Sequence, residues 1–290
     1  GAPEDWFRIR ARLKAVAQGV GLKLGDIESM SAPAGDTANE SEIADELVAL
    51  VQEKADLFHA PDDTCYAALT DGPPACYRLD TKAFAKWLGY AYYTSTTTKD
   101  HPGRAASDTA MRTAVVVLSG IATNEGDERP VYLRAAQHGG AYYIDLGSDD
   151  WSAVEVTPAG WRITARPPVQ FWRSNTARPL PMPHAGGDLS RLWQYANVPA
   201  EQRPLVLAVL LEALRPETPF PILELIGQQG TAKSSTQARL RRLVDPNAVD
   251  LRAAPKSVED LFVSAGANWV TSLNNLSHMS SQVQDALCNL

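Results

Sequence analysis

The feature that most constrains this chain is a segment in which an apolar run, a glycine-containing loop and a helical pattern follow one another. The apolar run spans 221–226, and the loop over 227–234 reads Gly-Gln-Gln-Gly-Thr-Ala-Lys-Ser. Apolar residues then recur at helical spacing at Ala238, Leu240 and Leu243. A strand that enters a helix through such a loop is a context in which proteins hold phosphate groups. We therefore predict a phosphate-binding loop that opens a P-loop nucleotide-binding domain.

Each residue type in this loop has a physical task. Glycines at 227 and 230 permit backbone angles in which successive N–H groups converge on a phosphate, and the helix N-terminus adds its partial positive charge. Lys233 is expected to reach the terminal phosphates, and the Ser234 hydroxyl is expected to ligate Mg²⁺. The alternative is a strand-to-helix turn whose lysine is merely solvated. The predicted nucleotide-binding residues are Gly227, Gly230, Thr231, Ala232, Lys233, Ser234 and Ser235, and Ala232 stands where the usual pattern has glycine.

A P-loop site needs a second strand that ends in an acidic residue near the metal. The candidate strand is 269–273, which is expected to run parallel to 221–226, either adjacent to it or one strand away. It ends in Asn274 and Asn275, and an asparagine brings no negative charge and is no general base. We predict catalytic-site positions at Lys233 and Asn274, with binding better supported than hydrolysis. Asp285 is expected to face solvent.

The chain is predicted to have three parts. Residues 1–60 form a helical segment with a linker near 29–40, residues 61–185 form a small α+β domain, and residues 186–290 form the N-terminal part of a P-loop ATPase domain. Short apolar runs between Gly-rich turns over 131–171 predict an antiparallel β-meander. The predicted fold class is therefore α/β, with an incomplete P-loop domain after the α+β domain. Further expected elements are helices over 6–17, 41–58, 81–90, 105–120, 189–196, 204–214 and 281–290, and a hairpin formed by 65–69 and 75–79.

Composition narrows the classes of function. A hydrophobic fraction of 44% predicts a buried core and excludes a disordered chain. No apolar run approaches the roughly 18 residues of a membrane span, and three widely spaced cysteines fit a reducing compartment, so we expect a cytoplasmic protein without a membrane partner. The net charge of -7 argues against a general nucleic-acid coat, although Arg239, Arg241 and Arg242 make a local basic strip. The dispersed histidines show no metal-binding spacing.

Aromatic residues are frequent between 90 and 172, and their pattern has two interpretations. They can stack single-stranded bases on a sheet face, or they can be ordinary strand core. Core is the favoured interpretation because alternating aromatics in strands usually point inward. The residues concerned are Tyr90, Tyr92, Tyr93, Tyr132, Tyr142, Tyr143, Trp151, Trp161, Phe171 and Trp172.

Four segments carry a resemblance to a known group of proteins: 225–235, 243–247, 268–277 and 285–288. Together they resemble the ATPase domain of ATP-binding proteins from bacterial mobile elements and phages. That group is related to primase-helicases of the AAA+ or superfamily-three type. Residues 131–180 are similar to the β-rich region that precedes the ATPase, so the similarity covers about residues 60 to 290.

The resemblance implies ATP phosphates at 230–233, Mg²⁺ at Ser234, and the acidic Walker B position at Asn274, where this chain departs from the family. It also implies a homo-oligomeric ring and single-stranded or duplex DNA as a partner. The family's sensor and arginine-finger positions fall after Leu290, and Gly1 is typical of a cut end, so we expect a fragment. Two functions remain open. One is an ATP-hydrolysing DNA-replication motor, and the other is a nucleotide-binding regulatory or scaffold module without efficient hydrolysis.

Overall fold

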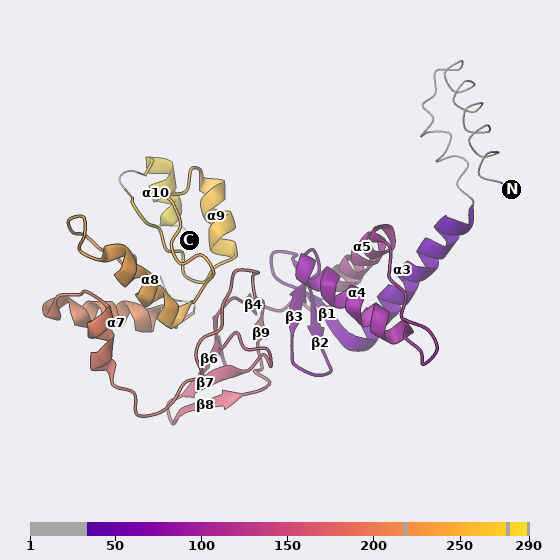
Figure 1. Ribbon diagram of the computed structural model, residues 1–290, viewed down its shortest axis with the longest axis horizontal. Helices are drawn as coiled ribbons and strands as arrows, with labels where there is room; N and C mark the ends of the chain where they lie inside the picture. The colour runs from indigo at the N-terminus through magenta and orange to yellow at the C-terminus, as the bar shows by residue number, and fades with distance from the viewer. Residues whose placement is uncertain (1–33, 217, 219, 277–278, 289–290) are drawn as a thin grey trace, which may run out of the picture. The chain divides into compact units, whose positions relative to one another are not determined.

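The computed structural model describes residues 34–216, 218, 220–276 and 279–288 (Figure 1). The expected helix over 6–17 and the start of the expected linker lie outside these residues. The chain divides into two compact units. The first contains Gly1–Leu50 and Gly89–Val116, and the second contains Val51–Leu88 and Val117–Leu290. The three-part division predicted from the sequence remains a prediction.

The first unit is built from parts of three helices, α3 (Ala34–Lys54), α4 (Lys82–Thr96) and α5 (Asp108–Asn124). Helix α3 differs from its prediction at both ends. Residues 34–40 were expected to be a linker, but they contain one glycine and no proline and belong to the helix. Residues 55–58 were expected to continue the helix, but they pair as a strand instead, because tertiary pairing outweighs a weak local preference.

A buried tyrosine joins the helices of the first unit. The Tyr92 hydroxyl donates a hydrogen bond to the Glu46 carboxylate at 2.6 Å, and Arg104 Nη2 donates to the same oxygen at 2.6 Å. The Arg104 guanidinium also lies 5.5 Å from the centre of the Tyr92 ring. The hydroxyl of this tyrosine is therefore satisfied by a carboxylate whose own charge is balanced by Arg104.

The second unit begins with a three-stranded antiparallel sheet of β1 (Ala55–His59), β2 (Cys65–Leu69) and β3 (Cys76–Arg78), in that order. Its last two strands confirm the predicted hairpin. Phe58 and Tyr66 stack at 5.5 Å between ring centroids and belong to the buried cluster of this sheet.

The predicted β-meander is confirmed over 135–164. Four antiparallel strands follow in chain order, β5 (Ala135–His138), β6 (Ala141–Asp145), β7 (Ala153–Thr157) and β8 (Gly160–Thr164). The outer parts of the predicted region instead form a parallel pair, β4 (Val131–Tyr132) with β9 (Gln170–Phe171).

The aromatic set divides between core and surface. Tyr143 and Phe171 belong to the buried cluster on one face of this sheet, as the core interpretation expects. Trp161 on β8 is 45% exposed, and Tyr90 and Tyr93 on α4 are also exposed. Core therefore describes part of the set only.

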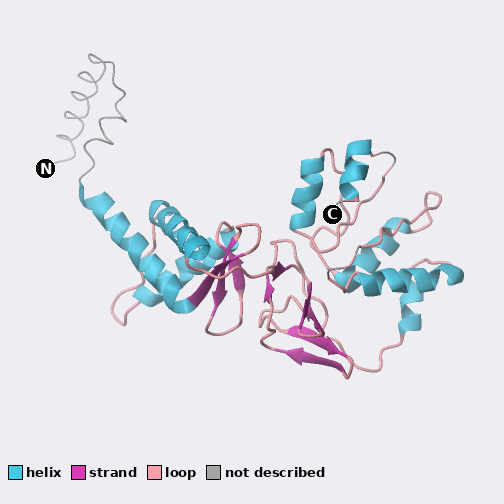
Figure 2. Ribbon diagram, turned by 180° about the vertical axis from the view of Figure 1, so that it is seen from behind, coloured by secondary structure: helices cyan, strands magenta, loops and turns pink. Residues whose placement is uncertain are grey.

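Helices and loops make up the rest of the second unit, and no strand is drawn there in Figure 2. None of the described helices has both the length and the apolar character that a membrane crossing requires. The elements are η1 (Leu189–Arg191), α6 (Leu192–Tyr195), η2 (Ala200–Gln202), α7 (Arg203–Glu212), α8 (Lys233–Val244), α9 (Val258–Gly266) and α10 (Ser281–Leu287).

The two strands expected to support the loop are not formed, so both predictions are wrong for this structure. Residues 221–226 make no backbone hydrogen bond to any described residue, and Ile222 and Ile226 are 74% and 85% exposed. Of the second segment, Leu273 alone makes a bridge, parallel to Arg252. An apolar run becomes a strand only where neighbours accept its backbone hydrogen bonds, and the described residues offer none to 221–226.

Tyr92 gives a testable pH dependence. Burial, and then the hydrogen bond to Glu46, raise the pKa of Tyr92 to about 12. Since an unfolded tyrosine has a pKa of about 10, the contribution of Tyr92 to stability is complete below pH 10 and is lost as the pH rises through about 12. We expect the ultraviolet difference titration between wild type and Tyr92→Phe to place this group about two pH units above an ordinary tyrosine. A midpoint near pH 10 contradicts the buried contact.

Candidate phosphate-binding site

The candidate site lies where the glycine-containing loop enters α8. Gly230 has φ +85°, and Ala232, the residue before the helix, has φ 60° and ψ 23°, in the left-handed region. The backbone N–H groups of residues 230–235 donate to no described residue, and the first helical bond runs from Thr236 N to Ala232 O at 2.9 Å. A row of free N–H groups at the positive end of a helix is a ready site for an anion.

The Lys233 side chain folds back over this loop. Its Nζ donates to the carbonyl oxygens of Gly227 and Gln228, each at 2.6 Å. The Thr231 hydroxyl donates to the Gln228 carbonyl at 2.8 Å, and a Cβ at position 227 would lie 3.0 Å from the Thr231 hydroxyl oxygen. The loop is therefore closed on itself, with the Lys233 ammonium group bound to two of its carbonyls.

Ser234, the predicted metal ligand, contacts Asn274, the predicted Walker B position. Ser234 Oγ donates to Asn274 Oδ1 at 3.0 Å, although the two residues are 40 positions apart in the chain. One turn further along α8, Gln237 Nε2 donates to the Leu273 carbonyl at 2.6 Å. Lys233, Ser234 and Asn274 thus gather at the start of one helix. Ser235 lies exposed on its first turn.

A backing layer that the sequence did not predict supports the loop from behind. Asn197 Nδ2 donates to the Thr231 carbonyl at 3.0 Å, and its backbone N–H donates to the buried Thr236 hydroxyl at 3.0 Å. Leu240 of α8 packs with Val198 and Val206 in one apolar cluster. Asn197 lies 34 residues before Thr231, and no motif marks it, so sequence reasoning had no signal with which to find it.

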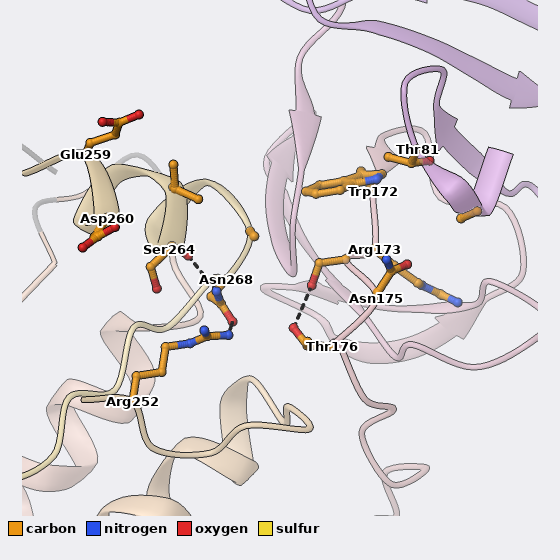
Figure 3. A pocket seen from close by; sticks show the side chains of 14 residues that line it. Thr81, Trp172, Arg173, Asn175, Thr176, Arg252, Glu259, Asp260, Ser264 and Asn268 are labelled. Carbon is orange, nitrogen blue, oxygen red and sulfur yellow. Dashed lines mark hydrogen bonds between the residues drawn. The ribbon is translucent and has the colours of Figure 1, made fainter. Parts of the chain in front are cut away.

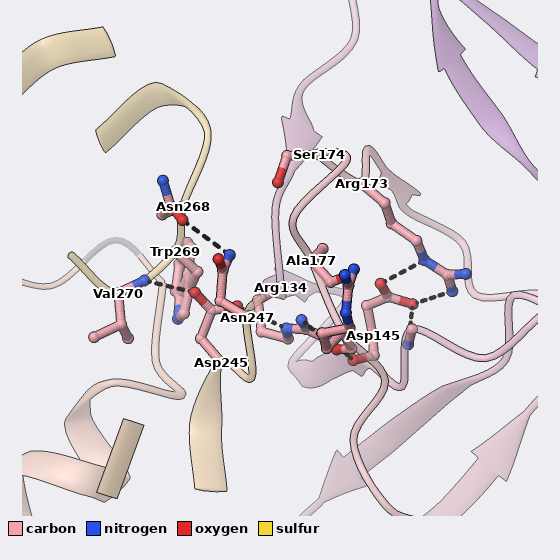
Figure 4. A network of polar contacts seen from close by, with 12 residues as sticks. Arg134, Asp145, Arg173, Ser174, Ala177, Asp245, Asn247, Asn268, Trp269 and Val270 are labelled. Carbon is pink, nitrogen blue, oxygen red and sulfur yellow. Dashed lines mark hydrogen bonds and ion pairs between the residues drawn. The ribbon is translucent and has the colours of Figure 1, made fainter. Parts of the chain in front are cut away.

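Behind the helix lies a buried polar network centred on Asp245 (Figure 4). Its Oδ1 accepts from Arg134 Nε at 3.2 Å, and its Oδ2 accepts from the backbone N–H of Val270 at 3.0 Å. Arg134 also donates to the carbonyl oxygens of Asp145 and Arg178, both at 3.0 Å. The network connects the end of α8 to the four-stranded sheet.

The basic strip expected at 239–242 is not a free basic surface. Arg241 is 2% exposed and donates to the carbonyls of Val249 and Asp250, and burial lowers the pKa of its guanidinium. Arg242 pairs with the Asp250 carboxylate, and Arg239 donates to the Tyr195 carbonyl. Arg241 therefore stabilises the fold, and the charge of Arg242 is compensated by Asp250. Arg239 is exposed, and its contact with a carbonyl leaves its charge uncompensated.

An open cleft of about 510 Å³ lies elsewhere in the second unit, between α9 and the segment after β9 (Figure 3). Trp172, Thr176, Arg252 and Asn268 are among its lining residues, and none of the site residues predicted from the sequence lines it. Arg173, which also lines it, is bound to the Asp145 carboxylate through two nitrogens, so its charge is compensated. The cleft is therefore separate from the candidate phosphate-binding site.

The site residues fit a phosphate better than a metal held by protein alone. No cluster of three or more His, Cys, Asp or Glu that could hold a metal ion occurs among the described residues. A magnesium ion bound through one or two protein oxygens normally takes its other ligands from phosphates and water. The Ser234 hydroxyl and the Asn274 amide offer one or two such protein oxygens. The free N–H groups at the start of α8 can donate hydrogen bonds to the phosphates.

Comparison with known proteins relates part of the chain to one family. Residues 187–290 match a family described as actinomycete integrative conjugative element replication protein. No curated protein matches the chain, and no solved structure matches it. The matched region contains every residue of the candidate site, from Asn197 to Asn274. The match indicates a replication protein of a mobile element, in line with the resemblance seen in the sequence, and its description names neither ATP nor helicase activity.

The left-handed conformation of Ala232 gives a stability prediction. A side chain with a Cβ costs about 1 to 2 kcal/mol in this region, whereas glycine loses about 0.4 to 1 kcal/mol through a freer unfolded chain. We therefore expect Ala232→Gly to leave the melting temperature unchanged or slightly higher. Ala238→Gly, inside helix α8, is the control and is expected to lower the free energy of unfolding by about 1 kcal/mol. Equal losses in both variants contradict a left-handed Ala232.

Proposed function

We propose that this chain is a mobile-element replication protein whose loop at 227–235 binds the phosphates of ATP together with Mg²⁺. The family match supports the first half of this proposal. The observation that carries the second half is the meeting of Lys233, Ser234 and Asn274 at the N-terminus of α8, with Ser234 Oγ 3.0 Å from Asn274 Oδ1. Residues of these types at the start of a helix after a Gly-containing loop are those that nucleotide-binding sites use.

The chain's own groups have defined roles in this proposal. The free N–H groups of 230–235 donate to phosphate oxygens. Lys233 gives up its hydrogen bonds to the carbonyls of Gly227 and Gln228, each 2.6 Å long, and binds the terminal phosphates instead. Ser234 offers its hydroxyl to Mg²⁺, which when bound supplies charge neutralisation of the phosphate oxygens.

The use made of the nucleotide has two candidates. The mobile-element resemblance favours an ATP-driven motor that acts on DNA as a ring. The neutral amide of Asn274 favours a switch that binds ATP without efficient hydrolysis, because no carboxylate contacts Ser234 among the described residues to hold the metal or to accept a proton from water. Of the two, the contacts of Asn274 support the switch, and ATP turnover stimulated by DNA would decide for the motor.

Binding is tested by calorimetry with ATPγS and ADP in the presence of Mg²⁺. We expect the wild type to bind and Lys233→Ala to lose about 10- to 100-fold in affinity, the range for losing hydrogen bonds from a charged donor. Lys256→Ala, which removes an exposed lysine from the same unit, is the control and should bind as the wild type does. Equal affinities in all three proteins, or no binding by the wild type, rule out the phosphate-binding loop.

Turnover is tested by restoring the missing charge. Asn274→Asp keeps an acceptor for Ser234 and adds a carboxylate beside it, so we expect this variant to gain Mg²⁺-dependent ATP hydrolysis over a wild type that binds without turnover. Asn275→Asp places the same charge one residue away and is expected to stay inactive. Phosphate release by the wild type at a rate equal to that of Asn274→Asp would contradict the interpretation as a switch that binds ATP without efficient hydrolysis.

A further inference from the structure

We propose that Gln237 and Asp245 are positioning residues that hold the segment 268–274 along α8 so that Asn274 meets Ser234. This inference rests on the proposed nucleotide site, because it explains how one half of that site is kept next to the other. Neither residue belongs to the loop, and the sequence alone assigns no role to either.

The segment 268–274 needs such support because it is not a member of a described sheet. Its backbone has one short contact with another stretch of chain, in which Arg252 N donates to the Ser272 carbonyl at 2.9 Å and Asn274 N donates to the Arg252 carbonyl at 2.8 Å. A strand inside a sheet is fixed by hydrogen bonds along its whole length. Here the remaining fixation comes from side chains.

Gln237 is the first of these side chains. It lies three residues after Ser234, and residues with this spacing share one face of a helix. Gln237 Nε2 donates to the Leu273 carbonyl at 2.6 Å, and Ser234 Oγ donates to Asn274 Oδ1 at 3.0 Å. One face of α8 therefore binds two successive residues, Leu273 and Asn274. The Gln237 bond fixes the position of Leu273 along the helix axis, and so it also fixes where the Asn274 amide lies relative to Ser234.

Asp245 is the second, at the other end of the helix. Its Oδ2 accepts from Val270 N at 3.0 Å, while its Oδ1 accepts from Arg134 Nε at 3.2 Å (Figure 4). Both oxygens of this carboxylate, which is 4% exposed, are therefore engaged in opposite directions. Arg134 precedes β5 and is 1% exposed, so the sheet region fixes the carboxylate that in turn fixes the segment.

The two halves of the nucleotide site should then respond differently to these residues. Contacts from Lys233 and the loop N–H groups act on phosphate whether or not a metal is present. Contacts of Ser234 and Asn274 act on the Mg²⁺ shell, so they determine how much Mg²⁺ improves nucleotide affinity. Loss of Gln237 or Asp245 contacts is expected to reduce this Mg²⁺ enhancement and to leave metal-free affinity unchanged.

The experiment measures ATPγS affinity with Mg²⁺ and with EDTA in the full chain. Gln237→Met keeps the side-chain length and removes the donor, and in Asp245→Asn the single amide oxygen leaves either Arg134 Nε or Val270 N facing an NH₂ group. The ratio of the two affinities is expected to fall about fivefold in each, the factor for one hydrogen bond of ordinary net strength. Glu155→Gln is the matched control, since that carboxylate is bound by the Tyr143 hydroxyl and by Arg162 and lies outside the contacts of Arg134 and Asp245. Its ratio should equal that of the wild type.

Two further readouts separate positioning from general destabilisation. In a Ser234→Ala background, Gln237→Met should cause no further change in the ratio, because both act through one contact. Amide hydrogen exchange over 268–274 without nucleotide should be faster in Gln237→Met and Asp245→Asn and unchanged in Glu155→Gln. If Asp245→Asn fails to fold, Gln237→Met alone decides, since its side chain is half-buried.

The outcomes for the proposed function and for this inference are distinct. A wild type that binds no ATPγS ends the proposed function, and the exchange of 268–274 then still tests the positioning contacts. A wild type that binds, with an unchanged Mg²⁺ ratio and unchanged exchange in Gln237→Met and Asp245→Asn, overturns the inference.

Discussion

The carboxylate of Asp245 is almost completely buried, and a charge in that position is tolerated only when it is paired and hydrogen-bonded. Arg134 supplies the pairing, and the backbone of Val270 supplies a second bond. Arg241 is a second and more distant partner, with Nη2 3.7 Å from Asp245 Oδ2. Loss of Arg134 would therefore remove the closer guanidinium and leave this buried carboxylate less well compensated. The position of Val270 beside the end of α8 therefore depends in part on a side chain that directly precedes β5.

A different constraint shapes the loop itself. A helix always leaves the N–H groups of its first turn without internal partners, and here no described residue accepts from them. Lys233 occupies the loop carbonyls, so donors and a cation are presented together. Both features follow from local backbone geometry, which is why this site can exist even though the apolar run at 221–226 lies outside any sheet.

The sequence predicted those parts of the structure that depend on local pattern. The hairpin at 65–79, the meander at 135–164 and the helix that follows the glycine-containing loop all follow from periodicity and turn residues. The strand at 55–59 was missed because its apolar residues also fit a helix, and its pairing with β2 decided the outcome.

Contacts between distant segments account for the rest. The meeting of Ser234 with Asn274 was expected from the P-loop pattern, whereas the roles of Asn197 and Arg134 were not. A single asparagine or arginine carries no periodicity, so its partner 34 or 111 residues away is fixed only by the folded chain. The basic strip is confirmed only in part for the same reason, since Arg239 and Arg242 are exposed whereas Arg241 is buried by contacts with distant residues.

The contacts at the two ends of α8 also fix the length of the segment 270–274 beside it. Val270 is held at the end of the helix and Asn274 at its beginning, so the segment runs in the opposite direction to α8. Eleven helical residues rise about 16 Å, and four extended residues span about 13 Å, so the two lengths match once side chains bridge the ends. An insertion or deletion within 271–273 would slip this register, whereas a change of length between 253 and 257 would alter neither end of it. The number of residues between Val270 and Asn274 is therefore fixed by contacts at both ends of α8, whereas the number between 253 and 257 is not.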